Sequence, residues 1–144
     1  LALVPLTPGA GVAAQPLWQP AIYCAALEFT RAERLDDLGD AAPARAGTPE
    51  GADLAGRTYL RIAAEAMDCP APAQLEAMLD TIGVGIAHRI DLAAQYGHGP
   101  EVTVMPLASE SELVCELHFD PALLERARAD EDRTPPAPLC PGSG

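Results

Sequence analysis

The stretch that decides the fold is residues 73–96, AQLEAMLDTIGVGIAHRIDLAAQY, which has the most regular apolar pattern in the chain. Its apolar residues recur every three or four positions, which is the spacing of one face of an α-helix. These residues are Leu75, Met78, Leu79, Ile82, Ile86, Ile90 and Ala93. The pattern predicts a long helix that is the central packing element of the fold, ended by the glycines and proline of residues 97–100.

Two further helices are predicted on the N-terminal side of this stretch. Trp18-Gln19-Pro20 opens the first, with Pro20 at a position where its missing N–H costs nothing, and the helix continues to about Leu38. The second begins at about Asp53, a residue type that caps helices, and ends at the cysteine and proline of residues 69–70. Residues 39–53, between the two, are rich in proline and glycine, so we expect a mobile loop there.

Residues 101–119 fit two different structures. Apolar residues at every second position of 113–119 predict one strand of a β-hairpin, with residues 101–105 as the other strand. The alternating residues are Leu113, Cys115, Leu117 and Phe119. Ser109 followed three residues later by Glu112 has the spacing of a helix capping box and indicates an extra helix instead. A last short helix, residues 122–129, is predicted after Asp120.

The fold class that these patterns predict is mainly α, with three main helices in a small bundle. A short C-terminal β-hairpin or an extra helix completes it, and the hairpin, which the alternation slightly favours, would make the fold α+β. The chain has 144 residues, the size of one domain, and its apolar content of 49% is enough to close one core.

Composition excludes several classes of function. The formal net charge is −12, so phosphate backbones and anionic membrane surfaces would repel the chain, and we expect no nucleic-acid partner. All nine basic residues are arginine, which excludes a lysine Schiff base and a P-loop lysine. No segment approaches the roughly 20 apolar residues of a membrane-spanning helix.

The N-terminus indicates export from the cell. Residues 1–14 have an apolar run followed by small residues up to Ala14, which is typical of the end of a signal peptide, although an ordinary disordered terminus would look similar. We therefore expect a signal-peptide remnant at 1–14, one helix-rich domain at 15–130, a disordered tail at 131–144, and a periplasmic or secreted location.

The four cysteines agree with an oxidising compartment, because their even number suits two disulfides. Spacing alone allows three pairings. If the first two helices are antiparallel neighbours, Cys24 lies near Cys69, and Cys115 would then bind Cys140 and hold the tail.

Two constellations could carry chemistry. His98, Cys115 and His118 include the Cys-x-x-His spacing of some zinc or copper sites, although on a strand positions 115 and 118 would point to opposite faces. His88 and Asp91 could form an acid/base pair on the polar side of the long helix. The same residues also suit a solvated helix face, and the chain has neither a Gly-x-Ser-x-Gly nor a Gly-x-Gly-x-x-Gly motif.

The function expected from the sequence is that of a small, exported, acidic, non-enzymatic binding or accessory protein. Its partner would be another protein or a small ligand, and the acidic surface favours a basic one. A metal-binding exported protein that uses zinc or copper is the alternative, and an enzyme built on His88 and Asp91 ranks third. No cofactor is expected, because no cofactor-binding motif is present.

Overall fold

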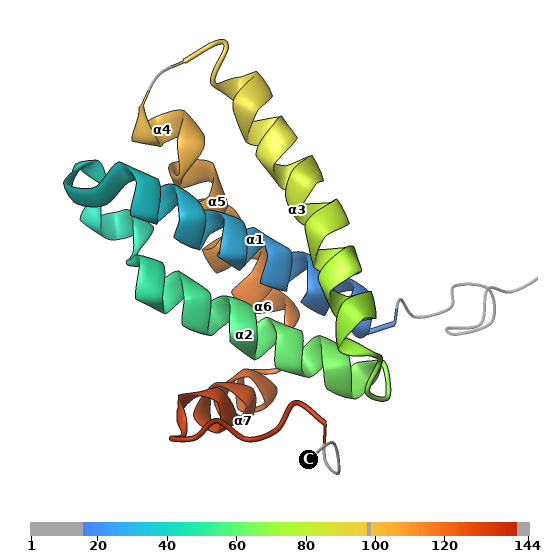
Figure 1. Cartoon of the computed structure of the whole chain (residues 1–144). Coiled ribbons are helices and arrows are strands. Elements are labelled where there is room, and N and C mark those ends of the chain that lie inside the picture. The colour runs from blue at the N-terminus through green and yellow to red at the C-terminus, as the bar shows by residue number, and fades with distance from the viewer. Residues whose placement is uncertain (1–15, 98, 141–144) are drawn as a thin grey trace, which may run out of the picture.

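The computed structural model describes residues 16–97 and 99–140, and over these ranges the chain is mainly helical and contains no strand (Figure 1). The main elements are α1 (Trp18–Leu38), α2 (Pro49–Ala66), α3 (Pro72–Ala93), α4 (Pro100–Thr103), α5 (Met105–Glu110), α6 (Glu116–His118) and α7 (Pro121–Asp132). Shorter elements are the 3₁₀ turns η1 (Gly39–Ala41) and η2 (Ala44–Ala46), and a π-helical segment, η3 (Ser111–Cys115). The predicted signal-peptide remnant, residues 1–14, lies outside the described residues.

Helix α1 lies at the centre of the fold, with α2 antiparallel to it and α3 crossing it (Figure 1). Small side chains make the close approach of α1 and α2 possible, because Ala21, Ala25 and Ala63 are completely buried between larger residues. A Cβ atom on Gly56 of α2 would lie 2.7 Å from the ring of Phe29 on α1, so glycine is needed at this crossing. The three predicted main helices are therefore present in a small helical domain, with α1 rather than α3 as the central packing element.

Helix starts follow local capping chemistry. The hydroxyl of Thr48 accepts a hydrogen bond from the backbone N–H of Gly51 at 3.0 Å, and Pro49 occupies the first position of α2. Helix α2 therefore begins four residues before the predicted start at Asp53. The carboxylate of Asp120 accepts a bond from the N–H of Ala122 at 2.9 Å and caps α7 near its predicted start.

The β-hairpin predicted for residues 101–119 is wrong. This segment forms α4, α5, η3 and α6 instead, which is the helical alternative, although Ser109 lies inside α5 and does not cap it. The strand pattern would place Leu113, Cys115, Leu117 and Phe119 together on a buried face. Only Cys115 and Phe119 are buried, whereas Leu113 and Leu117 are 66% and 76% exposed.

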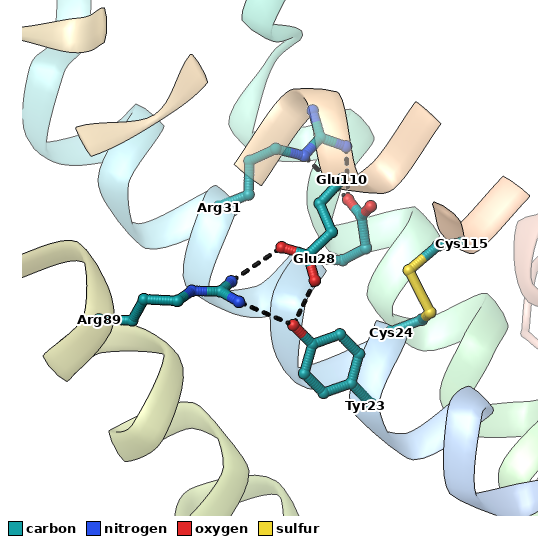
Figure 2. The surroundings of a disulfide bond; sticks show 7 residues. All are labelled: Tyr23, Cys24, Glu28, Arg31, Arg89, Glu110 and Cys115. Carbon is teal, nitrogen blue, oxygen red and sulfur yellow. Dashed lines mark hydrogen bonds and ion pairs between the residues drawn. A yellow bond between two sulfur atoms is a disulfide. The ribbon is translucent and has the colours of Figure 1, made fainter. Parts of the chain in front are cut away.

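Two disulfides are present, which confirms the predicted number, but the predicted pairing is wrong. Cys24 is bonded to Cys115, with 5.8 Å between their Cα atoms, and Cys69 is bonded to Cys140. Cys24 lies on the side of α1 that packs against η3, so Cys115 is within reach (Figure 2). Cys69 lies beyond the end of α2 in a turn where Asp68 and Cys69 have φ values of 56° and 60°. This turn directs Cys69 toward the C-terminal segment instead of α1.

A buried arginine holds the C-terminal segment against α2. Arg61 is 2% exposed and forms an ion pair with Glu131 of α7. Its guanidinium also donates to the carbonyl oxygens of Pro138 at 3.0 Å and Ala137 at 2.6 Å. Together with the bond from Cys69 to Cys140, these contacts attach residues 131–140 to the domain.

Candidate functional site

A groove of about 1070 Å³ lies on the described part of the chain. One side of α1 forms its floor, α3 forms one wall, and the first part of α2 contributes Asp53 at the rim. This volume exceeds what most single small molecules need and is large enough for a segment of polypeptide.

The rim of this groove is strongly acidic. Five carboxylates and one guanidinium line it, namely Glu33, Asp36, Asp37, Asp53, Asp80 and Arg34. Arg34 pairs with Asp91 at 3.3 Å and Asp53 pairs with Arg57 at 2.9 Å. Within residues 16–97 and 99–140, the other four rim carboxylates form no ion pair. Their charges are therefore available to a cationic group that enters the groove.

The floor and the α3 wall are partly apolar. Phe29 and Leu79 are partly buried there, and Val84 is 70% exposed although it is a large aliphatic residue. Gly83 adds no side chain, which keeps this part of the wall low. An apolar base between acidic edges complements a ligand that has both cationic and apolar groups.

Two polar contacts join α3 to α1 beside the groove. Arg34 of α1 binds Asp91 of α3, as described above. Figure 2 shows the second contact, in which Arg89 of α3 reaches Tyr23 of α1 and Glu110 of α5. Arg89 lies 2.8 Å from Glu110, and the Tyr23 hydroxyl donates to the same carboxylate. Burial and then the bond to Glu110 raise the pKa of Tyr23, so its phenol remains a proton donor at neutral pH.

The residues predicted as metal ligands are not gathered into one site among the described residues. His98 lies outside them. Cys115 is completely buried and bonded to Cys24, so it has no free thiolate while the disulfide is intact. His118 is exposed and packs edge-on against Phe119, with 5.1 Å between the ring centroids. In the described ranges, no group of three histidine, cysteine, aspartate or glutamate side chains is arranged to hold a metal ion.

The predicted acid/base pair lies on the exposed side of α3. Asp91 binds Arg34 of α1, and no hydrogen bond joins it to His88. Neither residue lines the groove. In this arrangement Asp91 positions α3, and His88 is an exposed side chain with no described catalytic partner.

The sequence did not predict the groove, although it placed several of its residues on polar helix faces. Glu33 and Asp36 belong to the polar side of α1, and Asp80 belongs to that of α3. A usable signal was Val84, a large apolar residue outside the main apolar stripe of α3. It indicated a second, partly apolar face on that helix.

Comparison of the chain with protein-family models, with curated proteins and with solved structures finds no match. Within residues 16–97 and 99–140, none of the helices combines the length and the apolar character that crossing a membrane requires. A functional proposal for this chain therefore depends on the geometry and charge of the groove.

Proposed function

We propose that this protein is a non-enzymatic binding or accessory protein that holds a basic segment of a partner protein in the groove between α1 and α3. The observation that carries the proposal is the set of unpaired carboxylates around a partly apolar floor. Arginine or lysine side chains of the partner would pair with Asp36, Asp37 and Asp80, while an apolar side chain would cover Val84.

We further propose that the protein acts in the periplasm or outside the cell. Both disulfides are intramolecular, and disulfides of this kind persist in oxidising compartments. The small-residue pattern that ends at Ala14 supports the same location. A basic partner would therefore be met after export.

The binding proposal can be tested with a fluorescently labelled peptide of alternating arginine and leucine, followed by fluorescence anisotropy. We expect saturable binding that weakens as ionic strength rises, because salt screens exposed charges. The double variant Asp36→Asn/Asp80→Asn should weaken binding about fivefold, since each exposed ion pair contributes up to about 1 kcal/mol. Val84→Ser should weaken binding without changing its salt dependence.

A matched control separates the groove from general charge. Glu112→Gln/Glu125→Gln removes the same two negative charges from exposed positions outside the groove. This control should bind the peptide as the natural chain does. Equal losses in the two double variants, or binding of a peptide with glutamate in place of arginine, would show that the groove is not the binding site.

A further inference from the structure

A second cavity, of about 340 Å³, lies apart from the groove, where α1, α2, η3 and α7 meet. It differs from the groove in size and in charge. Its volume is at the lower end of the range for small-molecule sites. Its apolar wall is formed by aliphatic side chains of α2 and α7, namely Leu54, Ala55 and Leu124.

Two largely buried residues present hydroxyl groups to this cavity. Tyr59 is 3% exposed and Ser111 is 7% exposed, and both line the cavity. Among the described residues, neither hydroxyl has a hydrogen-bond partner. Neither hydroxyl oxygen is among the fully enclosed unpaired side-chain atoms of the described residues, so both remain accessible and are free to bond a ligand in the cavity. Burial and then the nearby Glu28 raise the pKa of Tyr59, which keeps the phenol protonated as a donor.

Three charged residues line the cavity, and one of them is already paired within the protein. Arg31 also lines it, but its guanidinium is bound by the fully buried Glu28 and by the carbonyl oxygen of Ala46. Glu116 and Arg128 remain, and neither forms an ion pair with any described residue or with the other. The cavity thus offers one uncompensated negative and one uncompensated positive group.

We propose that this cavity binds a small zwitterion of the α-amino acid class. The ammonium of the ligand pairs with Glu116, its carboxylate pairs with Arg128, and an aliphatic side chain lies against Leu54 and Leu124. A simple anion would leave Glu116 unsatisfied, and a simple cation would leave Arg128 unsatisfied. This site does not depend on the proposed role of the groove.

Isothermal titration calorimetry with free L-leucine tests the proposal, followed by a panel of the other protein amino acids. Two analogues isolate the charges, because leucinamide has no carboxylate and N-acetylleucine has no ammonium. We expect saturable binding of at least one free amino acid, and binding about three- to tenfold weaker for analogues that lack either charge.

Conservative variants assign each contact. Glu116→Gln should weaken binding of the amino acid but not of its N-acetyl analogue, and Arg128→Gln should weaken binding of the amino acid but not of its amide. Both positions are exposed, so these variants should fold normally. Asp36→Asn/Asp80→Asn in the groove should leave amino-acid binding unchanged. The proposal is overturned if no amino acid binds at millimolar concentration, or if binding is the same in the natural chain and in both charge variants.

Discussion

Replacing Arg61 by methionine tests how the C-terminal segment is held. The change keeps an unbranched side chain but removes the guanidinium, which leaves Glu131 buried at 7% exposure without its main partner. It also removes the donors to the carbonyl oxygens of Ala137 and Pro138. Breaking one side of a buried ion pair costs about 3–5 kcal/mol, because an uncompensated buried charge remains. Total stabilities of small domains are only about 5–15 kcal/mol, so the loss should be obvious.

Arg57 provides a matched control for this prediction. It lies one helical turn before Arg61 and also contacts Glu131, at 3.4 Å, but its side chain is 39% exposed. Arg57→Met should therefore lower the free energy of unfolding by about 0–1 kcal/mol. Both variants would be compared with the natural chain by urea denaturation without reductant, so that the bond from Cys69 to Cys140 stays closed.

A double variant makes the test sharper. Arg61→Met/Glu131→Gln removes both buried charges, so it should regain part of the stability that Arg61→Met loses. The reasoning is refuted if Arg61→Met loses no more stability than Arg57→Met. It is also refuted if the double variant is less stable than Arg61→Met alone.

Three further predictions use features elsewhere in the fold. Gly56→Ala places a Cβ 2.7 Å from the ring of Phe29 and should lower the free energy of unfolding in the urea assay by about 1–3 kcal/mol. Gly85→Ala has open space around the new Cβ, so it should raise the free energy of unfolding by up to about 1 kcal/mol, because alanine favours the helix more than glycine does. Burial raises the pKa of Tyr59, so the folded state favours the protonated phenol, and the free energy of unfolding should fall as the pH rises above the unfolded-state pKa of about 10. Tyr59→Phe removes this titration and should flatten the alkaline part of a plot of unfolding free energy against pH, whereas parallel curves for the two proteins would contradict the argument. When the protein is reduced with limiting dithiothreitol, alkylated and analysed by mass spectrometry, Cys69 and Cys140 should be labelled first, because the bond between Cys24 and Cys115 is buried. Equal labelling of all four cysteines would contradict this difference in accessibility.

The long helices could be predicted from the sequence because each has an apolar stripe with a helical period. The predicted span of residues 73–96 corresponds to α3 at Pro72–Ala93. The helix predicted to open at Trp18-Gln19-Pro20 and to end at about Leu38 corresponds to α1 at Trp18–Leu38. Their ends are set by proline, glycine and capping side chains, which act within a few residues. The start of α2 was missed because Asp53 can cap a helix, but Thr48 and Pro49 do so four residues earlier.

The candidate sites were not predictable in the same way, because several elements build each of them. The groove combines carboxylates of α1 with an apolar wall of α3, and each helix alone has the composition of an ordinary solvated face. The disulfide pairing depends similarly on orientation. Helices α1 and α2 are antiparallel neighbours, as predicted, but that relation does not say which side of α1 bears Cys24. The side chain faces η3, and this rotation is a property of the assembled core.

Residues 101–119 show how a correct apolar pattern led to the wrong element. The buried positions of this segment are Val104, Leu107, Ser111, Cys115 and Phe119. Their spacing of three or four residues is helical, but Ser111 conceals it, because a serine is not counted as apolar. Leu113 and Leu117 then complete a false alternation around Cys115. The sulfur of Cys115 is bonded to Cys24 of α1, so this side of the helix must face the core, and the two leucines are consequently turned toward solvent. A bond between residues that are 91 positions apart thus determines the orientation of a segment whose local pattern fits two structures.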